Sequence, residues 1–214
     1  PDTKDSVCCS VEALGATKAL RLIERTRRKL GNSQAPDASE APLFGHRWSL
    51  FVQWLSGLMT EAASESKVPF DFSKFSQDQL RSFYKDGELG NDIKASYQNL
   101  ISSALAKQYP QFPEFPNKST PDIASVHLLL DELLSYVRSD GFKDELSSAL
   151  PQDIDPEIRI EVAMSLYEEK FLQIADNLSF GKDEITFVSF QTVSLLNPDE
   201  FTQKSTDIVM QLLS

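Results

Sequence analysis

Residues 185–193, with the sequence ITFVSFQTV, are the only stretch whose composition argues for a β-strand. They are rich in β-branched and aromatic residues, which strands favour. No second convincing strand occurs elsewhere in the chain, and an isolated strand would leave its backbone N–H and C=O groups without partners. We therefore interpret 185–196 as a helix and predict an all-α protein with negligible strand content.

On both sides of this stretch, three helix starts share one pattern: a capping side chain, then proline, then an acid. The N–H of the first helical residue has no partner within the helix, so proline, which lacks this N–H, is well suited to that position. The acid that follows complements the positive helix end. Apolar residues then recur at helical spacing, as Ile123, Val126, Leu130 and Leu133 illustrate. Between the first two of these helices, 143–150 predicts one or two short helical turns. The three starts are Thr120-Pro121-Asp122, Asp155-Pro156-Glu157 and Asn197-Pro198-Asp199.

The first half of the chain predicts further helices. Trp48, Phe51, Leu55, Leu58 and Ala62 recur at intervals of three and four, which indicates a helix over 46–64. A capping box at Ser76 predicts a short helix that ends near Gly87, and 91–108 predicts the next helix. Residues 10–30 form an amphipathic pattern with an arginine stripe. Gly31–Pro42 has no apolar periodicity and predicts a solvated linker that leaves the first helix loosely tethered.

Charge divides the chain at the proline-aromatic segment 109–116, YPQFPEFP. Residues 1–110 have a net charge of +1, whereas residues 111–214 have 7 basic and 19 acidic residues and a net charge of −12. We expect an irregular bundle of seven or eight helices, or two stacked helical halves. The expected parts are a basic amphipathic helix (1–31), a flexible linker (32–44), a first helical half (45–108), a proline-aromatic joint (109–120) and an acidic second half (121–214).

Residues 183–190, DEITFVSF, resemble the second half of an EF-hand loop, in which an isoleucine at the eighth position precedes an apolar helix. With Ile185 at that position, Leu178, Phe180 and Lys182 stand where the first three oxygen ligands belong. Ser189 then replaces the bidentate glutamate. The resemblance covers about a dozen residues. It implies a degenerate helix-loop-helix that binds no calcium ion.

The usual local motifs of enzymes are missing from the sequence. It has no glycine-rich phosphate loop, nucleophile elbow, Cys-x-x-Cys or His-Glu-x-x-His pattern. Its two histidines, His46 and His127, have no patterned ligands beside them. We therefore predict no catalytic residues, no metal site and no cofactor, although distant residues can still assemble a site that sequence does not reveal.

Two groups of residues suggest binding sites. Adjacent cysteines can be acylated, and a lipid beside a basic patch gives stable peripheral attachment to membranes, although a solvated helix face explains the same residues. Aromatic residues in loops anchor protein interfaces, or else fill gaps between helices of their own chain. The candidate membrane-attachment residues are Cys8, Cys9, Arg21, Arg25 and Arg28, and the candidate partner-binding residues are Phe70, Phe72, Phe75, Phe112 and Phe115.

By elimination, the leading hypothesis is a non-catalytic helical adaptor, scaffold or subunit that binds proteins, among them partners with a basic surface. The negative charge opposes nucleic acid as a partner, and no apolar run reaches the roughly 20 residues of a membrane span. The first alternative is a peripheral membrane protein. The second is an enzyme or small-ligand carrier with a pocket between helices, to which Trp48, Trp54, His46, His127, Tyr97 or Tyr136 contribute.

The two cysteines are adjacent, so they cannot cross-link distant parts of the fold. This favours a reducing, intracellular location, either the cytoplasm or the interior of an organelle. The sequence starts at Pro1 without a signal-peptide pattern, which is compatible with a targeting segment that has been removed.

Overall fold

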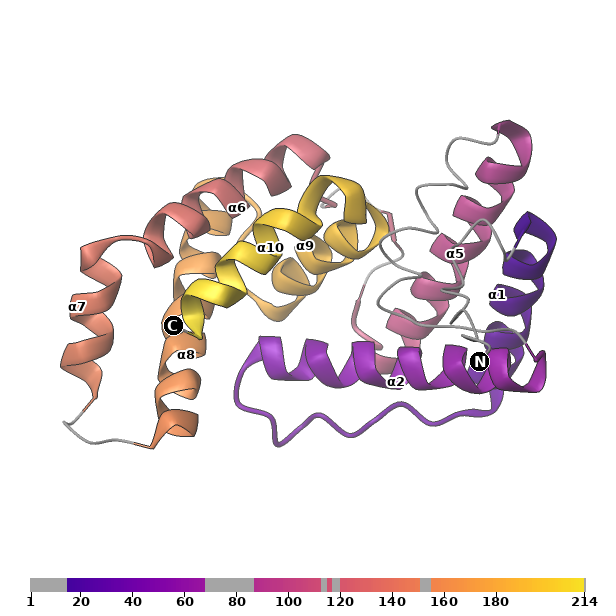
Figure 1. Cartoon of the computed structure of the whole chain (residues 1–214), viewed down its shortest axis with the longest axis horizontal. Helices are drawn as coiled ribbons and strands as arrows, with labels where there is room; N and C mark the ends of the chain where they lie inside the picture. The colour runs from indigo at the N-terminus through magenta and orange to yellow at the C-terminus, as the bar shows by residue number, and fades with distance from the viewer. Residues whose placement is uncertain (1–14, 68–86, 113–114, 117–119, 151–154, 214) are drawn as a thin grey trace, which may run out of the picture. The chain divides into compact units, whose positions relative to one another are not determined.

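The computed structural model describes residues 15–67, 87–112, 115–116, 120–150 and 155–213. Over these ranges the chain forms eight α-helices and no strand, which confirms the all-α prediction (Figure 1). The stretch with strand-like composition is helical, as predicted, and lies within α9. The helices are α1 (Gly15–Asn32), α2 (Phe44–Glu65), α5 (Gly87–Gln108), α6 (Ile123–Val137), α7 (Asp140–Ala149), α8 (Pro156–Asn177), α9 (Glu184–Leu196) and α10 (Pro198–Leu212).

The chain divides into two compact units. Unit 1 comprises Pro1–Pro36 and Phe51–Pro113, and unit 2 comprises Asp37–Leu50 and Glu114–Ser214. The last boundary between the units falls inside the proline-aromatic segment. Another, between Leu50 and Phe51, falls within α2, so the opening turns of this helix belong to unit 2 and the remainder to unit 1.

Unit 1 is built on α1, α5 and the larger part of α2. The apolar side of α1 packs against α5, with Ala19, Leu22, Ile23 and Leu30 buried. Lys29 at the end of α1 forms ion pairs with Glu65 at 2.6 Å and with Glu61 at 3.3 Å, both on α2. The structure therefore gives α1 a packed place in unit 1, which differs from the loose attachment expected of it.

The C-terminal end of α1 is capped by a lysine from α5. The Nζ atom of Lys107 donates hydrogen bonds to the carbonyl oxygens of Leu30 at 2.5 Å, Gly31 at 3.1 Å and Ser33 at 2.9 Å. The last carbonyl groups of a helix have no partner within it and carry partial negative charge. One cation thus satisfies several of them and ties the two helices together.

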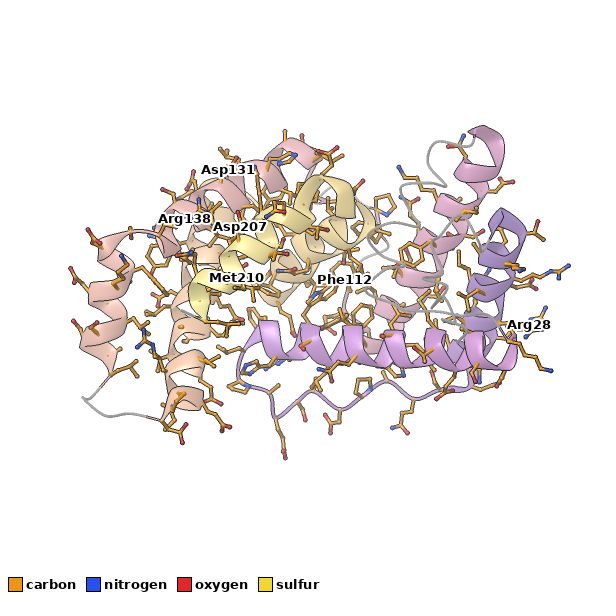
Figure 2. The ribbon with its side chains drawn as sticks, in the orientation of Figure 1. Arg28, Phe112, Asp131, Arg138, Asp207 and Met210 are labelled. Carbon is orange, nitrogen blue, oxygen red and sulfur yellow. The ribbon has the colours of Figure 1, made fainter. Side chains whose placement is uncertain are left out.

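Unit 2 contains α6 to α10, in which α6 packs against α7, α8, α9 and α10. Ion pairs join α6 to α10: Arg138 lies 3.5 Å from Asp207, and Lys204 lies 2.5 Å from Asp131 (Figure 2). The ring of His127 packs on Phe201, with 4.8 Å between the ring centroids. These contacts fix the rotation of α10 about its own axis relative to α6.

The three proline-containing helix starts differ in how they are capped. Asp155 caps α8 as predicted, since its carboxylate accepts from the N–H of Glu157 at 2.9 Å. The prediction for α6 was wrong by two residues, because Asp122 and not Thr120 is the N-cap, and its carboxylate accepts from the N–H of Ser125. The carboxylate of Asp122 reaches the third N–H of the helix, so the chain begins to coil only after it.

Asn197 is both the C-cap of α9 and the N-cap of α10. Its side chain makes no capping bond to α10. Instead its Nδ2 atom donates to the carbonyl oxygen of Val193 at 2.8 Å, in the last turn of α9. A single residue therefore joins two helices.

The connection between α8 and α9 is a loop whose conformation is held by side-chain hydrogen bonds. Thr186 donates to the carbonyl oxygen of Phe180 at 2.9 Å, and Asp183 accepts from the N–H of Thr186 at 2.8 Å. Gly181 has φ of +95°, a conformation in which a side chain would be strained. Over the described ranges, no group of three or more His, Cys, Asp or Glu residues is arranged to hold a metal ion.

Candidate ligand cavity and surface groove

A cluster of phenylalanines lines part of a cavity in unit 2. The ring of Phe171 on α8 lies 4.7 Å from that of Phe187 and 5.7 Å from that of Phe190, both on α9. Phe44, at the start of α2, extends the cluster with a centroid distance of 6.2 Å to Phe187. Aromatic pairs at these separations add to the stability that their burial gives.

The cavity has a volume of about 240 Å³. It lies between the start of α2 and helices α6, α8, α9 and α10, and all of its lining residues belong to unit 2. Apolar and aromatic side chains make up most of the wall, and the remainder is polar. The lining residues are Gly45, Trp48, Val126, Leu129, Leu130, Met164, Tyr167, Glu168, Phe171, Phe187, Phe190, Gln191, Ser194, Ser205, Ile208, Val209 and Leu212.

Glu168 is the one carboxylate in this wall. Its two oxygens accept hydrogen bonds from the backbone of α2. Its Oε1 atom accepts from the backbone N–H of Phe44 at 3.1 Å, and its Oε2 atom accepts from that of Gly45 at 2.8 Å. Glu168 is buried. The first N–H groups of a helix have no partner within it, so one side chain satisfies two of them and is itself stabilised by the positive helix end.

Tyr167 stands next to Glu168 on α8 and presents a phenol to the cavity. Burial, together with the neighbouring Glu168 carboxylate, raises its pKa above the ordinary value of a tyrosine. The hydroxyl group therefore stays protonated under ordinary conditions and acts as a neutral polar group. The other polar side chains of the wall, Gln191, Ser194 and Ser205, are also neutral.

An open groove of about 320 Å³ runs along α10 and the end of α9. Three of its residues, Ser194, Ser205 and Val209, also line the cavity, so the two hollows adjoin at α9 and α10. In α10, Val209 and Met210 line this groove and are exposed to 51% and 61%, and Figure 2 labels Met210. Leu213, the residue that follows α10, is exposed to 57%. The remaining groove residues are Phe201, Thr202, Thr206 and Met210.

The structure buries the two described members of the aromatic set expected to bind a partner. Phe112 lies in the core of unit 1 and Phe115 in that of unit 2. This placement agrees with the alternative expectation that they fill gaps between helices. Phe70, Phe72 and Phe75 lie outside the described residues.

The candidate membrane-attachment residues are described only in part. Cys8 and Cys9 lie outside the described residues. Arg21, Arg25 and Arg28 are exposed on α1, and Figure 2 labels Arg28. Arg28 forms an ion pair with Glu24, and Arg25 donates to the hydroxyl oxygen of Ser66 at 2.6 Å. The apolar side of α1 is buried against α5 and is not available for insertion into a lipid layer in this conformation.

Of the six residues proposed for a pocket between helices, Trp48 alone lines the cavity. Trp54 and Tyr97 belong to unit 1, and Tyr136 donates to Glu145 at 2.6 Å. The Nε2 atom of His127 lies 3.2 Å from a carboxylate oxygen of Glu200. The sequence analysis missed Glu168 and the α9 and α10 serines. Their only signal was a polar side chain within an apolar helical pattern, which also occurs on solvated faces.

No protein-family model matches the chain, and comparison with curated proteins and with solved structures gave no match either. In the described part of the chain, none of the helices combines the length and the apolar character that crossing a membrane requires. The two hollows in unit 2 are the features of the described residues that suggest a binding function.

Proposed function

We propose that the protein is a non-catalytic helical module, an adaptor, scaffold or assembly subunit, that binds another protein through α10. The observation that carries the proposal is the row of exposed apolar side chains on this helix. Val209 and Met210, which line the open groove, and Leu213, the residue that follows the helix, are each more than half exposed, and we call these three residues the apolar ridge. Contiguous exposed apolar surface of this kind is typical of sites that bind proteins.

The shape and charge of this surface favour an amphipathic helix with basic residues as the bound element. A groove beside an exposed apolar ridge suits the apolar face of a helix, whose anchors recur every three or four residues. Residues 111–214 have a net charge of −12, which attracts basic segments and repels nucleic acids. The proposed partner is therefore a protein, and the proposal includes no nucleic acid.

Affinity capture and cross-linking at physiological salt test the proposal. The experiment compares the parent protein with the double variant Met210→Glu/Leu213→Glu, which places charge on the apolar ridge. Loss of an interface anchor costs about 2 kcal/mol or more, so recovery of a specific partner should fall at least about tenfold. Circular dichroism establishes that the variant keeps its helices.

The matched control is Ser147→Glu/Ser148→Glu, which adds two charges at exposed positions of α7 that line neither hollow. The control should recover the same partner as the parent protein. If neither a partner nor self-association is found with the parent, or if the double variant retains every partner, the proposal is wrong.

A second candidate function is peripheral attachment to membranes, which the exposed arginines of α1 favour. Because the apolar side of α1 is buried, the contact would be electrostatic and would need acylation of Cys8 or Cys9 for stable attachment. Labelling with a palmitate analogue should then fail in the Cys8→Ser/Cys9→Ser variant. Equal labelling of the parent and the variant eliminates this candidate.

The two adjacent cysteines also support an intracellular location, in the cytoplasm or inside an organelle, as part of the proposal. Microscopy of the tagged full-length protein tests this. Secretion into the medium would contradict it.

A further inference from the structure

We propose that the cavity of unit 2 binds a neutral, mostly apolar small molecule the size of one or two aromatic rings, with one hydrogen-bonding group. This inference goes beyond the proposed protein-binding function and does not depend on it. It rests on the volume of the cavity, the charges of its wall and the position of its polar groups.

The volume sets the size of the ligand. An engineered cavity of roughly 150 Å³ that is lined by leucine, isoleucine and phenylalanine binds benzene. The cavity of unit 2 is larger, at about 240 Å³, and has a wall of similar chemistry. Known pockets for larger, drug-sized ligands begin at roughly 300 Å³. A ligand of one ring, or of two fused rings, matches this range.

The wall determines the charge of the ligand. It contains no lysine, arginine or histidine, so a carboxylate or phosphate would be desolvated without a counter-ion. Both oxygens of its single acid, Glu168, already accept hydrogen bonds from the positive start of α2, which weakens the attraction of this carboxylate for a cationic ligand. A neutral molecule needs no counter-ion in the wall and loses less hydration energy when it enters.

The polar groups indicate how the ligand enters and lies. Ser194 and Ser205 line both the cavity and the open groove, so they stand where the two hollows adjoin. A hydroxyl or amide group of the ligand can hydrogen-bond to these serines while its apolar body contacts Phe171 and Phe190. The α9–α10 side of the cavity is therefore the polar end and the proposed entrance.

Two probes of similar size separate the proposed ligand class from its anionic counterpart. At about pH 7, 4-bromophenol is neutral because phenols ionise well above that pH, whereas 4-bromobenzoate is an anion. Bromine quenches tryptophan fluorescence at short range. Trp48 lines the cavity and Trp54 does not, so the Trp54→Phe protein reports on the cavity through Trp48 alone.

Titration of the Trp54→Phe protein with 4-bromophenol should quench Trp48 with a saturable curve. Binding of 4-bromobenzoate should be at least about tenfold weaker. Linear, unsaturable quenching by both probes, equal to that of a free tryptophan analogue, overturns the proposal. Binding of 4-bromobenzoate as tight as that of 4-bromophenol overturns the assignment of a neutral ligand.

A pair of neighbouring substitutions on α10 places the binding in the cavity or in the groove. Ser205→Leu fills the polar end of the cavity and should weaken binding of 4-bromophenol at least about tenfold. Thr206→Leu adds the same side chain at a position that lines only the groove, and it should leave the binding unchanged. Circular dichroism and the melting temperature confirm that both variants are folded.

The reverse pattern, with loss of binding in Thr206→Leu and retention in Ser205→Leu, would assign the probe to the groove and overturn the proposal. Unchanged binding in both variants would do the same. If Ser205→Leu is unfolded, Val126→Phe fills the cavity from α6 and carries the same expectation.

Discussion

At the scale of single residues, Glu168 has two roles. It caps the start of α2, and it forms part of the wall of the cavity. A carboxylate is buried at low cost only where donors replace the water that it loses. The backbone N–H groups of Phe44 and Gly45 supply them, from a segment more than a hundred residues earlier in the sequence. This contact makes the first turns of α2 part of unit 2.

Substitution of Glu168 should therefore destabilise the protein. In Glu168→Ala, two N–H groups in a partly buried region lose their acceptor, and the free energy of unfolding should fall by about 2 kcal/mol. Urea titration followed by circular dichroism measures this. Glu169→Ala, at the exposed neighbouring position, should change it by less than about 0.5 kcal/mol. Equal effects of the two substitutions would contradict the capping role.

Asp122, the N-cap of α6, gives a prediction for pH. Hydrogen bonds from the hydroxyl and the backbone N–H of Ser125 hold the pKa of Asp122 below its usual value. Because the folded pKa is lower than the unfolded one, the stabilisation is complete above the unfolded pKa and is lost as the pH falls through the folded pKa. A carboxyl-carbon NMR titration should show Asp122 ionising below pH 3.8, the ordinary value of an aspartate.

The Asp122→Asn variant keeps a capping oxygen but does not titrate. The stability difference between the parent and this variant should therefore narrow as the solution is acidified. A difference that stays constant between neutral and acidic pH would contradict the assigned direction of the pKa shift.

At the scale of elements, hydrogen bonds from a side chain of one helix to the backbone of another help to hold the two helices together. Lys107 in α5 holds three carbonyl groups at the end of α1. Lys107→Met should lower the free energy of unfolding by about 1 kcal/mol, a value that allows for the exposure of this side chain. Lys107→Arg should retain most of the stability because it keeps a cationic donor. Thermal unfolding of the three proteins measures both effects, and a Met variant as stable as the parent would contradict the capping role.

The sequence predicted where most helices lie but not how they pack. Periodicity marked α2 and α6, and the lone strand-like stretch was correctly assigned to a helix because it had no partner strand. Thr120 was the wrong cap because Thr120 and Asp122 both have capping side chains, and only the backbone conformation distinguishes them. Lys107 of α5 also holds the end of α1, and its three acceptors lie 74 or more residues away along the chain.

The candidate site was harder to predict because no local pattern encodes it. Five helices contribute to the cavity, and each contributes residues that look like ordinary core positions. Trp48 was the one cavity residue that the sequence analysis named as a candidate for a pocket. Glu168 lies in the charged run of residues 168–170, which is typical of a solvated helix face, so its burial follows only from the contact with α2.

At the scale of the whole molecule, the two tryptophans of the chain report on different units. Both lie on α2, but Trp48 belongs to unit 2 and Trp54 to unit 1. Phe171→Ala removes a large side chain from the core of unit 2, which costs about 3–5 kcal/mol. The urea midpoint reported by Trp48 should therefore fall more than the midpoint reported by Trp54.

The measurement uses Trp54→Phe and Trp48→Phe backgrounds, so that each protein contains one tryptophan. Leu100→Ala, in the core of unit 1, is the reciprocal control and should shift mainly the transition seen by Trp54. Identical shifts at both tryptophans in both variants would mean that the chain unfolds as one cooperative body.

The single-residue connection at Asn197 leaves no room for changes in chain length. An α-helix turns by about 100° per residue, so one inserted residue near the start of α10 would rotate everything after it by that angle. The wall of the cavity would then receive side chains that now face solvent, and the exposed ridge would receive those of the core. Natural variants should accordingly show no insertion or deletion from Leu196 to Leu212, however much the residues themselves differ. Engineered insertions in this range should not be tolerated.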